Sequence, residues 1–350
     1  MTTNKFLFIR ILLFFGLFLL SPTLTLAQSY STSQNNTSNS SQANALFSKG
    51  NFREVTQVLW KNFDRLTRSE LLLLIKSHLK LSEYDKVVKI VDILTSKNPK
   101  DYEAFSFLGN AYFLKAQKLK AGDEWKKSRE KAVESYKSAL EIKKDYINAY
   151  TGLIQLYEAE KNIYELRQIY RDLIEMSGDQ YAWLIKLCEI DTNDSIYDSA
   201  LKNCDKAKKS RPSDPKAFVF YAKALYGMGE LEKGKLELKN TALQFKNSDF
   251  ANSAYADLLF EEKNYQDAFK FYGISSQLNP QSYEAWIGYA NSSFEIQKFA
   301  EALTGYSKAC TLNKLAWPIL KKSTNILRNS SNLNWLSKYE SATERCGLRK

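Results

Sequence analysis

Histidine is nearly absent from this 350-residue sequence, and its scarcity excludes several kinds of active site. Serine and cysteine nucleophiles rely on a histidine general base, but His78 is the only histidine and lies in phase with apolar residues of a predicted helix. That spacing indicates a packed core side chain. Phosphate-binding signatures (GxxxxGKS/T, GxGxxG), CxxC pairs and Cys/His clusters with metal-ligand spacing are absent as well. We expect no enzyme, no cofactor and no metal site, although a hydrolase built from two carboxylates of distant segments stays open as an alternative.

Glycine and proline are scarce too, with 13 and 6 residues, which is typical of long helices joined by short turns. Positive charge is plentiful, since 50 Lys and Arg outnumber 39 Asp and Glu and leave a formal net charge of +11. The basic residues are spread along the chain rather than gathered in one block. This distribution favours anionic partners or surfaces but does not indicate nucleic-acid binding.

The segment 1–27 is typical of an export signal. Lys5 and Arg10 flank the start of an unbroken apolar run over 11–20, and Thr25-Leu26-Ala27 resembles a small-residue cleavage site. The run is short for a bilayer span. We expect export to a bacterial periplasm, or secretion, and a mature protein that does not span the membrane. An uncleaved signal anchor is the alternative.

A pattern that returns about every 34 residues organises the rest of the chain. Segments that begin near 215, 249 and 283 each contain two amphipathic runs, with apolar residues three and four apart, separated by a short polar turn. Prolines such as Pro99 end several of the second runs, because the residue before a proline is pushed out of the helical region. A period in this range predicts stacked helix pairs that bury their apolar faces against neighbours.

These segments resemble tetratricopeptide repeats, whose signature places aromatic and small residues at set positions. The residues that carry the resemblance are Phe105, Leu108, Gly109 and Tyr112 in one segment, and Trp286, Tyr289, Ala290, Ala302, Tyr306 and Ala309 in another. The resemblance implies an all-α fold, a right-handed superhelical solenoid of antiparallel helix pairs with about seven to eight repeats. The expected parts are a signal peptide (1–27), a disordered polar linker (28–42), the repeat array (43–316) and C-terminal capping helices (317–350).

The repeat is interrupted once, between Tyr112 and Ala132, where about eleven extra residues fall at the turn inside one helix pair. We expect this insertion, over about 115–131, to lengthen both helices into a basic protrusion. The basic residues assigned to it are Lys118, Lys120, Lys126, Lys127 and Arg129. A solvated helical extension is the simpler interpretation, and a contact site for an anionic partner is the other.

The resemblance also implies a concave groove lined by the first helix of each pair. The partner-binding residues predicted from that register are Lys76, Asn110, Phe113, Gln155, Lys223, Tyr226, Phe260, Asn291 and Phe294. Amide and ammonium groups interleaved with aromatic rings suit an extended peptide. Packing of the aromatic rings on the next repeat is the alternative explanation for the same pattern.

Four cysteines in an exported chain invite disulfide bonds. In the repeat register, Cys188 and Cys204 lie midway along two antiparallel helices of one pair, which favours a bond between them, with two buried thiols as the alternative. Cys310 and Cys346 lie near the ends of helices in consecutive units, where a bond would fasten the C-terminal cap.

These observations predict a non-enzymatic scaffold or adaptor outside the cytoplasm. It would bind a protein or peptide in the groove, with the basic protrusion favouring acidic groups, and it would not bind nucleic acid. The alternative is an envelope-associated binder of an anionic polymer or lipid surface through basic patches. The sequence makes no prediction of oligomeric state.

Overall fold

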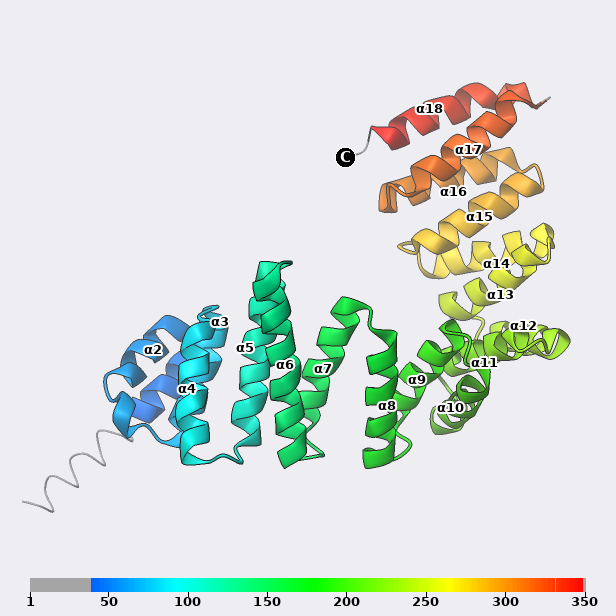
Figure 1. Cartoon of the computed structure of the whole chain (residues 1–350). Helices are drawn as coiled ribbons and strands as arrows, with labels where there is room; N and C mark the ends of the chain where they lie inside the picture. The colour runs from blue at the N-terminus through cyan, green and yellow to red at the C-terminus, as the bar shows by residue number, and fades with distance from the viewer. Residues whose placement is uncertain (1–38, 331, 349–350) are drawn as a thin grey trace, which may run out of the picture. The chain divides into compact units, whose positions relative to one another are not determined.

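The structure is a computed structural model that describes residues 39–330 and 332–348, and this part of the chain is all-α without a strand (Figure 1). Residues 39–48 form the first helix. The elements after it are α2 (Phe52–Trp60), η1 (Phe63–Arg65), α3 (Arg68–Lys80), α4 (Tyr84–Lys97), α5 (Tyr102–Leu119), α6 (Asp123–Ile142), α7 (Ile147–Glu160), α8 (Ile163–Ser177), α9 (Tyr181–Asn193), α10 (Tyr197–Ser210), α11 (Pro215–Gly227), α12 (Leu231–Gln244), α13 (Asp249–Glu261), α14 (Tyr265–Leu278), α15 (Tyr283–Glu295), α16 (Phe299–Leu312), α17 (Ala316–Arg328), η2 (Leu333–Trp335) and α18 (Leu336–Gly347).

The predicted signal peptide (1–27) and most of the predicted linker (28–42) lie outside the described residues. The end of that linker, over 39–42, is helical rather than irregular. The side chain of Ala43 is fully buried, so the polar turn before it continues a helix that packing already holds in place.

Chain contacts divide the molecule into two units, Met1–Leu153 and Ile154–Lys350, with α7 running across the boundary. Within each unit, consecutive helices pack as pairs and each pair packs on the next one along the chain. The described helices therefore form the stacked pairs that the repeat period predicts.

The turn inside each pair from α7–α8 to α15–α16 has the same backbone conformation from one repeat to the next. Its central residues, each one repeat after the last, are Lys161, Ser195, Gly229, Lys263 and Gln297, and all have a positive φ between 55° and 94°. The amide after each of them donates back to a carbonyl five residues earlier, as in Asn264 N to Leu259 O at 2.8 Å. This left-handed ending satisfies carbonyls that would otherwise lack partners and reverses the chain.

A tyrosine of the second helix interlocks with glycines of first helices in two repeats, at Tyr136 and at Tyr272. An added Cβ would lie 2.6 Å from the Tyr136 ring at Gly109, in the same pair, and 2.3 Å from it at Gly152, in the next helix. A Cβ at Gly288 would likewise lie 2.3 Å from the Tyr272 ring. Each tyrosine thus fills a space that only a residue without a side chain leaves open.

We name the two sides of this contact by their register. The tyrosine positions, one in each successive repeat, are Tyr136, Tyr170, Cys204, Leu238, Tyr272 and Tyr306. The facing positions, at the equivalent place on the first helix that follows, are Gly152, Lys186, Phe220, Ala254 and Gly288. Tyrosine meets glycine at the first and the last of these pairs, and the pairs between them differ.

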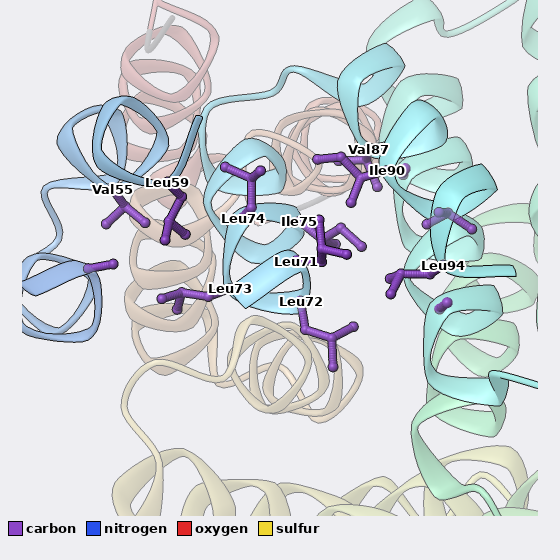
Figure 2. Close-up of a cluster of buried hydrophobic side chains, with 14 residues drawn as sticks. Val55, Leu59, Leu71, Leu72, Leu73, Leu74, Ile75, Val87, Ile90 and Leu94 are labelled. Atoms are coloured by element: carbon purple, nitrogen blue, oxygen red, sulfur yellow. The ribbon is translucent and has the colours of Figure 1, made fainter. Parts of the chain in front are cut away.

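The core of the first unit surrounds α3, which is buried along five consecutive residues from Leu71 to Ile75. Figure 2 shows these side chains directed toward Val55 and Leu59 of α2 on one side and toward Val87 and Ile90 of α4 on the other. A helical stretch that is apolar on every side needs several neighbours, and α2, α4 and α5 supply them.

His78 belongs to this core, as predicted, with 1% of its surface exposed. Its Nδ1 lies 2.6 Å from the Glu83 Oε2, and burial lowers the pKa of the imidazole. The one histidine of the chain therefore closes a turn between α3 and α4 and is not displayed on a surface.

Both predicted cysteine pairs are disulfides. Cys188 and Cys204 join α9 to α10 with Cα atoms 5.0 Å apart, and Cys310 and Cys346 join α16 to α18 with Cα atoms 5.6 Å apart. The first bond occupies a tyrosine position, so a covalent link replaces the aromatic contact there. The second encloses α17 and is supported by Tyr339, whose hydroxyl donates to the Phe299 carbonyl at 3.0 Å.

The tyrosine–glycine contact predicts that alanine substitutions at two glycines, one inside the contact and one outside it, change stability differently. We expect Gly288→Ala to lower the free energy of unfolding by about 1–3 kcal/mol, because the new methyl group overlaps the Tyr272 ring. Gly273→Ala is the matched control, since its Cβ would lie 3.4 Å from the Tyr289 ring and alanine favours helix. Urea unfolding followed by circular dichroism measures both. Equal stability of the two variants would contradict the interlock.

The disulfides predict that thiols react only after reduction. In denaturant without reductant, a maleimide should label none of the four cysteines, and after reduction it should label all of them. Reduction should lower the free energy of unfolding by about 2–4 kcal/mol per bond, because the unfolded chain regains freedom. The Cys310→Ala/Cys346→Ala variant, which keeps only the other bond, serves as the control. Labelling before reduction would show that the bonds do not form.

Candidate functional site

In each first helix, the residue directly after the small packing residue occupies an equivalent position. The predicted groove residues were chosen from this position and from the residue three places after it. The position is occupied by Lys76, Asn110, Gln155, Glu189, Lys223, Asp257 and Asn291. The sequence prediction omitted Glu189 and Asp257, although they lie one repeat before and one repeat after Lys223 and the period alone would have found them. The omission matters because both are acidic.

Tyrosine hydroxyls of second helices hold several residues at this position. Tyr136 donates to Asn110 Oδ1 at 2.7 Å, Tyr306 to Asn291 Oδ1 at 2.8 Å, and Tyr272 to an oxygen of Asp257 at 2.6 Å. Burial raises the pKa of Tyr272 well above its usual range, so its hydroxyl remains a proton donor. These bonds orient the amide and carboxylate groups and occupy one acceptor of each.

The structure brings three of the predicted residues into one cavity of about 420 Å³ in the second unit. We call it the α11–α13 cavity, and its lining residues are Lys223, Tyr226, Gly227, Leu238, Ala254, Asp257, Leu258, Phe260, Glu261 and Tyr272. The predicted members are Lys223, Tyr226 and Phe260. The Phe260 ring is fixed by an edge contact with Tyr265, with centroids 5.0 Å apart.

This cavity forms where the interlock is altered. Leu238 stands at the tyrosine position and Ala254 at the facing position, and both line the cavity. Leucine is shorter than the tyrosine that fills the equivalent space against Gly152 and Gly288, so room is left between the helices. The cavity therefore coincides with an altered pair in the repeat pattern, Leu238 against Ala254.

A second cavity of about 270 Å³ lies at another altered pair, Tyr170 and Lys186. We call it the α8–α9 cavity, and its lining residues are Glu158, Ile163, Leu166, Tyr170, Lys186, Glu189, Ile190, Asn193 and Asp194. Of its charged groups, Asp194 is paired with Arg167, which also donates to the buried Asp191 at 2.7 Å. Lys186 lies 3.5 Å from Glu189.

The remaining predicted groove residues lie outside both cavities. Phe113 is 8% exposed and packs inside the first unit, so packing explains this ring. The Lys76 Nζ lies 5.6 Å from the Phe107 ring centroid, and Gln155 is exposed on α7. Phe294 packs against Phe299 and Tyr339 under the C-terminal cap.

The insertion lengthens both helices of its pair, as predicted, since α5 has 18 residues and α6 has 20, against 13 to 15 in α3, α4 and α7 to α16. Lys118, Lys120, Lys126 and Lys127 are exposed at the tip, whereas Arg129 is half-buried. Among the described residues, no group of His, Cys, Asp and Glu could hold a metal ion. Over the same residues, every helix is too short or too polar to cross a bilayer.

No protein-family model matches the chain. It is 26% identical over 160 residues to anaphase-promoting complex subunit 7 of Mus musculus and of Homo sapiens, a match that covers 45% of this chain and only 28% of those proteins. A tetratricopeptide repeat protein from Parabacteroides merdae aligns with a TM-score of 0.50 and 13% identity, covering 89% of this chain and 99% of that one. This likeness supports a tetratricopeptide-repeat-like fold and carries no information on function.

Two predicted groove residues should separate packing from surface roles. We expect Phe113→Ala to lower the free energy of unfolding by about 3–5 kcal/mol, because it leaves a cavity in a packed core. Lys223→Ala should change it by less than about 0.5 kcal/mol, because the side chain is half-exposed and makes no ion pair among the described residues. Denaturant unfolding of both variants measures the difference, and a large loss for Lys223→Ala would assign that lysine to the fold.

Proposed function

We propose that this protein is a non-enzymatic scaffold or adaptor that binds an extended segment of a protein partner along its first helices. The α11–α13 cavity carries the proposal, because it places Lys223, Tyr226 and Phe260 from two neighbouring repeats around one open space. Aromatic anchors beside a charged group are the residues that dominate protein–peptide recognition. The backbone of the surrounding helices is already hydrogen-bonded, so recognition falls to these side chains.

The position of His78 supports a role without catalysis. Its imidazole is buried in the first unit and hydrogen-bonded to Glu83, so neither cavity of the second unit has a histidine general base. The charged groups in the cavities are carboxylates and lysines on helices, which suit binding.

We further propose that the protein works outside the cytoplasm, in a bacterial periplasm or after secretion, without spanning the membrane. The two disulfides support this location, because such bonds persist in oxidising compartments and are rare in the cytosol. The export signal over residues 1–27 is the other support.

A second candidate is an envelope-associated binder of an anionic polymer or lipid surface. The four exposed lysines at the tip of α5 and α6 favour it, since they are the concentrated positive charge that such a surface attracts. An acidic protein partner would contact the same protrusion. Binding there should weaken steeply with salt, whereas anchoring by aromatic rings should not.

Closing the cavity tests the main proposal. Leu238→Tyr/Ala254→Gly recreates the tyrosine–glycine pair of other repeats, so we expect this variant to fold. It should bind the partner that the wild-type protein captures from the native compartment at least about tenfold more weakly. Lys126→Glu/Lys127→Glu is the matched control on the protrusion and should retain the partner. Loss of the partner only in the protrusion variant would favour the second candidate.

A further inference from the structure

The cavities of the second unit carry a charge opposite to that of the whole chain. The chain has a net charge of +11, yet the acidic residues that line the two cavities are Glu158, Glu189, Asp194, Asp257 and Glu261, against the lysines Lys186 and Lys223. Asp194 shares the guanidinium of Arg167 with the buried Asp191, so the carboxylates without an arginine partner are two in each cavity, beside one ammonium group. A protein with excess positive charge has thus concentrated negative charge on one helix face.

The α8–α9 cavity has the form of a binding site for a long cationic side chain. Ile163, Leu166 and Ile190 supply apolar walls, and Glu158 and Glu189 supply carboxylates. Such a site can bury the methylene stem of a lysine or arginine while its charged group meets the acids.

Tyr170 adds an unused polar group to the same cavity. Its side chain is 4% exposed, and its hydroxyl has no hydrogen-bond partner among the described residues, although Tyr136, Tyr272 and Tyr306 at the same register all donate to a neighbour. Burial, together with the nearby Glu158 and Glu189, raises the pKa of Tyr170 to about 12. A hydroxyl that lines a cavity and makes no hydrogen bond within the protein is free to donate to or accept from a ligand.

The α11–α13 cavity repeats this chemistry with aromatic walls. Asp257 and Glu261 lie four residues apart on α13 and therefore share a face, and both are exposed. Tyr226 and Phe260 offer ring surfaces on which a cation can rest. The last turns of α11 and α13 also end here, and their carbonyl ends add partial negative charge.

We propose that the first-helix face of the second unit binds an extended basic segment of a protein, with a lysine or arginine side chain in each cavity. This inference rests on the proposed function and specifies the partner. Lys223 then has a role beside the cation, as a donor to a backbone carbonyl of the same segment. The basic protrusion of the first unit has the opposite preference, so one segment cannot satisfy both surfaces by charge.

The test uses the mature chain with both disulfides formed and three fluorescent peptides of equal length, with capped ends, in which alternate residues are lysine, glutamine or glutamate. Fluorescence anisotropy measures their dissociation constants. We expect the lysine peptide to bind at least about tenfold more tightly than the other two, against the repulsion of the net positive charge. Glu158→Gln/Glu189→Gln and Asp257→Asn/Glu261→Gln should each weaken it by about tenfold.

Glu232→Gln, an exposed acid on α12 that lines neither cavity, is the matched control and should change nothing. Lys223→Gln should leave the lysine peptide bound or bind it more tightly. If the glutamate peptide bound more tightly than the lysine peptide, and Lys223→Gln abolished that binding, the proposed preference for a basic segment would be wrong. The groove would still be the binding site. If none of the three peptides bound, the proposed preference for a basic segment would also be wrong. The capture experiment with Leu238→Tyr/Ala254→Gly would then test the proposed function separately. If the lysine peptide bound equally well to the wild-type protein and to both double variants of the four acids, neither cavity would be its binding site.

Discussion

The contact between a second-helix tyrosine and glycines of first helices, present at Tyr136 and at Tyr272, fixes the spacing of the helices around it. At Tyr136 the ring lies so close to Gly109 and Gly152 that any side chain there would overlap it. A ring held on both sides fixes the distance and the register of the helices around it, because packed interiors do not compress. The hydrogen bond from its hydroxyl to Asn110 then orients the surface position next to the contact. Core packing and surface display are therefore controlled by the same residue.

Variation at this contact explains the α8–α9 and α11–α13 cavities. Tyrosine against glycine closes the space, a disulfide at Cys204 replaces the ring by a covalent bond, and leucine against alanine leaves a cavity. At Tyr170 the ring is kept, but the facing residue is Lys186, and a cavity with acidic walls results. The regular repeats supply rigidity and the irregular ones supply sites. The acids Glu189 and Asp257 occupy the surface position beside these openings, which concentrates negative charge where the helices leave room.

Much of the fold could be predicted from the sequence, because helical periodicity and the repeat period are local properties. The pairs, the turn at Ser195 and the long α5 and α6 follow from spacing. Spacing also placed the cysteines of both disulfides within reach of each other, but it left free thiols open as the alternative. The site was predicted less well. Periodicity tells which side of a helix is buried, but it does not tell whether a neighbour fills the space opposite. Phe113 is in the core for this reason, while Phe260, at the equivalent register, lines a cavity that depends on the size of Leu238. The helical conformation of residues 39–42 was missed because these polar residues carry no apolar signal.

The bond between Cys310 and Cys346 has a mechanical consequence. The link encloses α17 and most of α18 in a covalent loop that is closed at α16. Tension applied at the C-terminal end of the chain therefore bypasses the noncovalent packing of the cap and enters the array at Cys310. The last helices cannot peel away one after another, as the ends of stacked repeats otherwise do. If a partner or an attached surface pulls on this end, the first structure to bear the load is a complete helix pair.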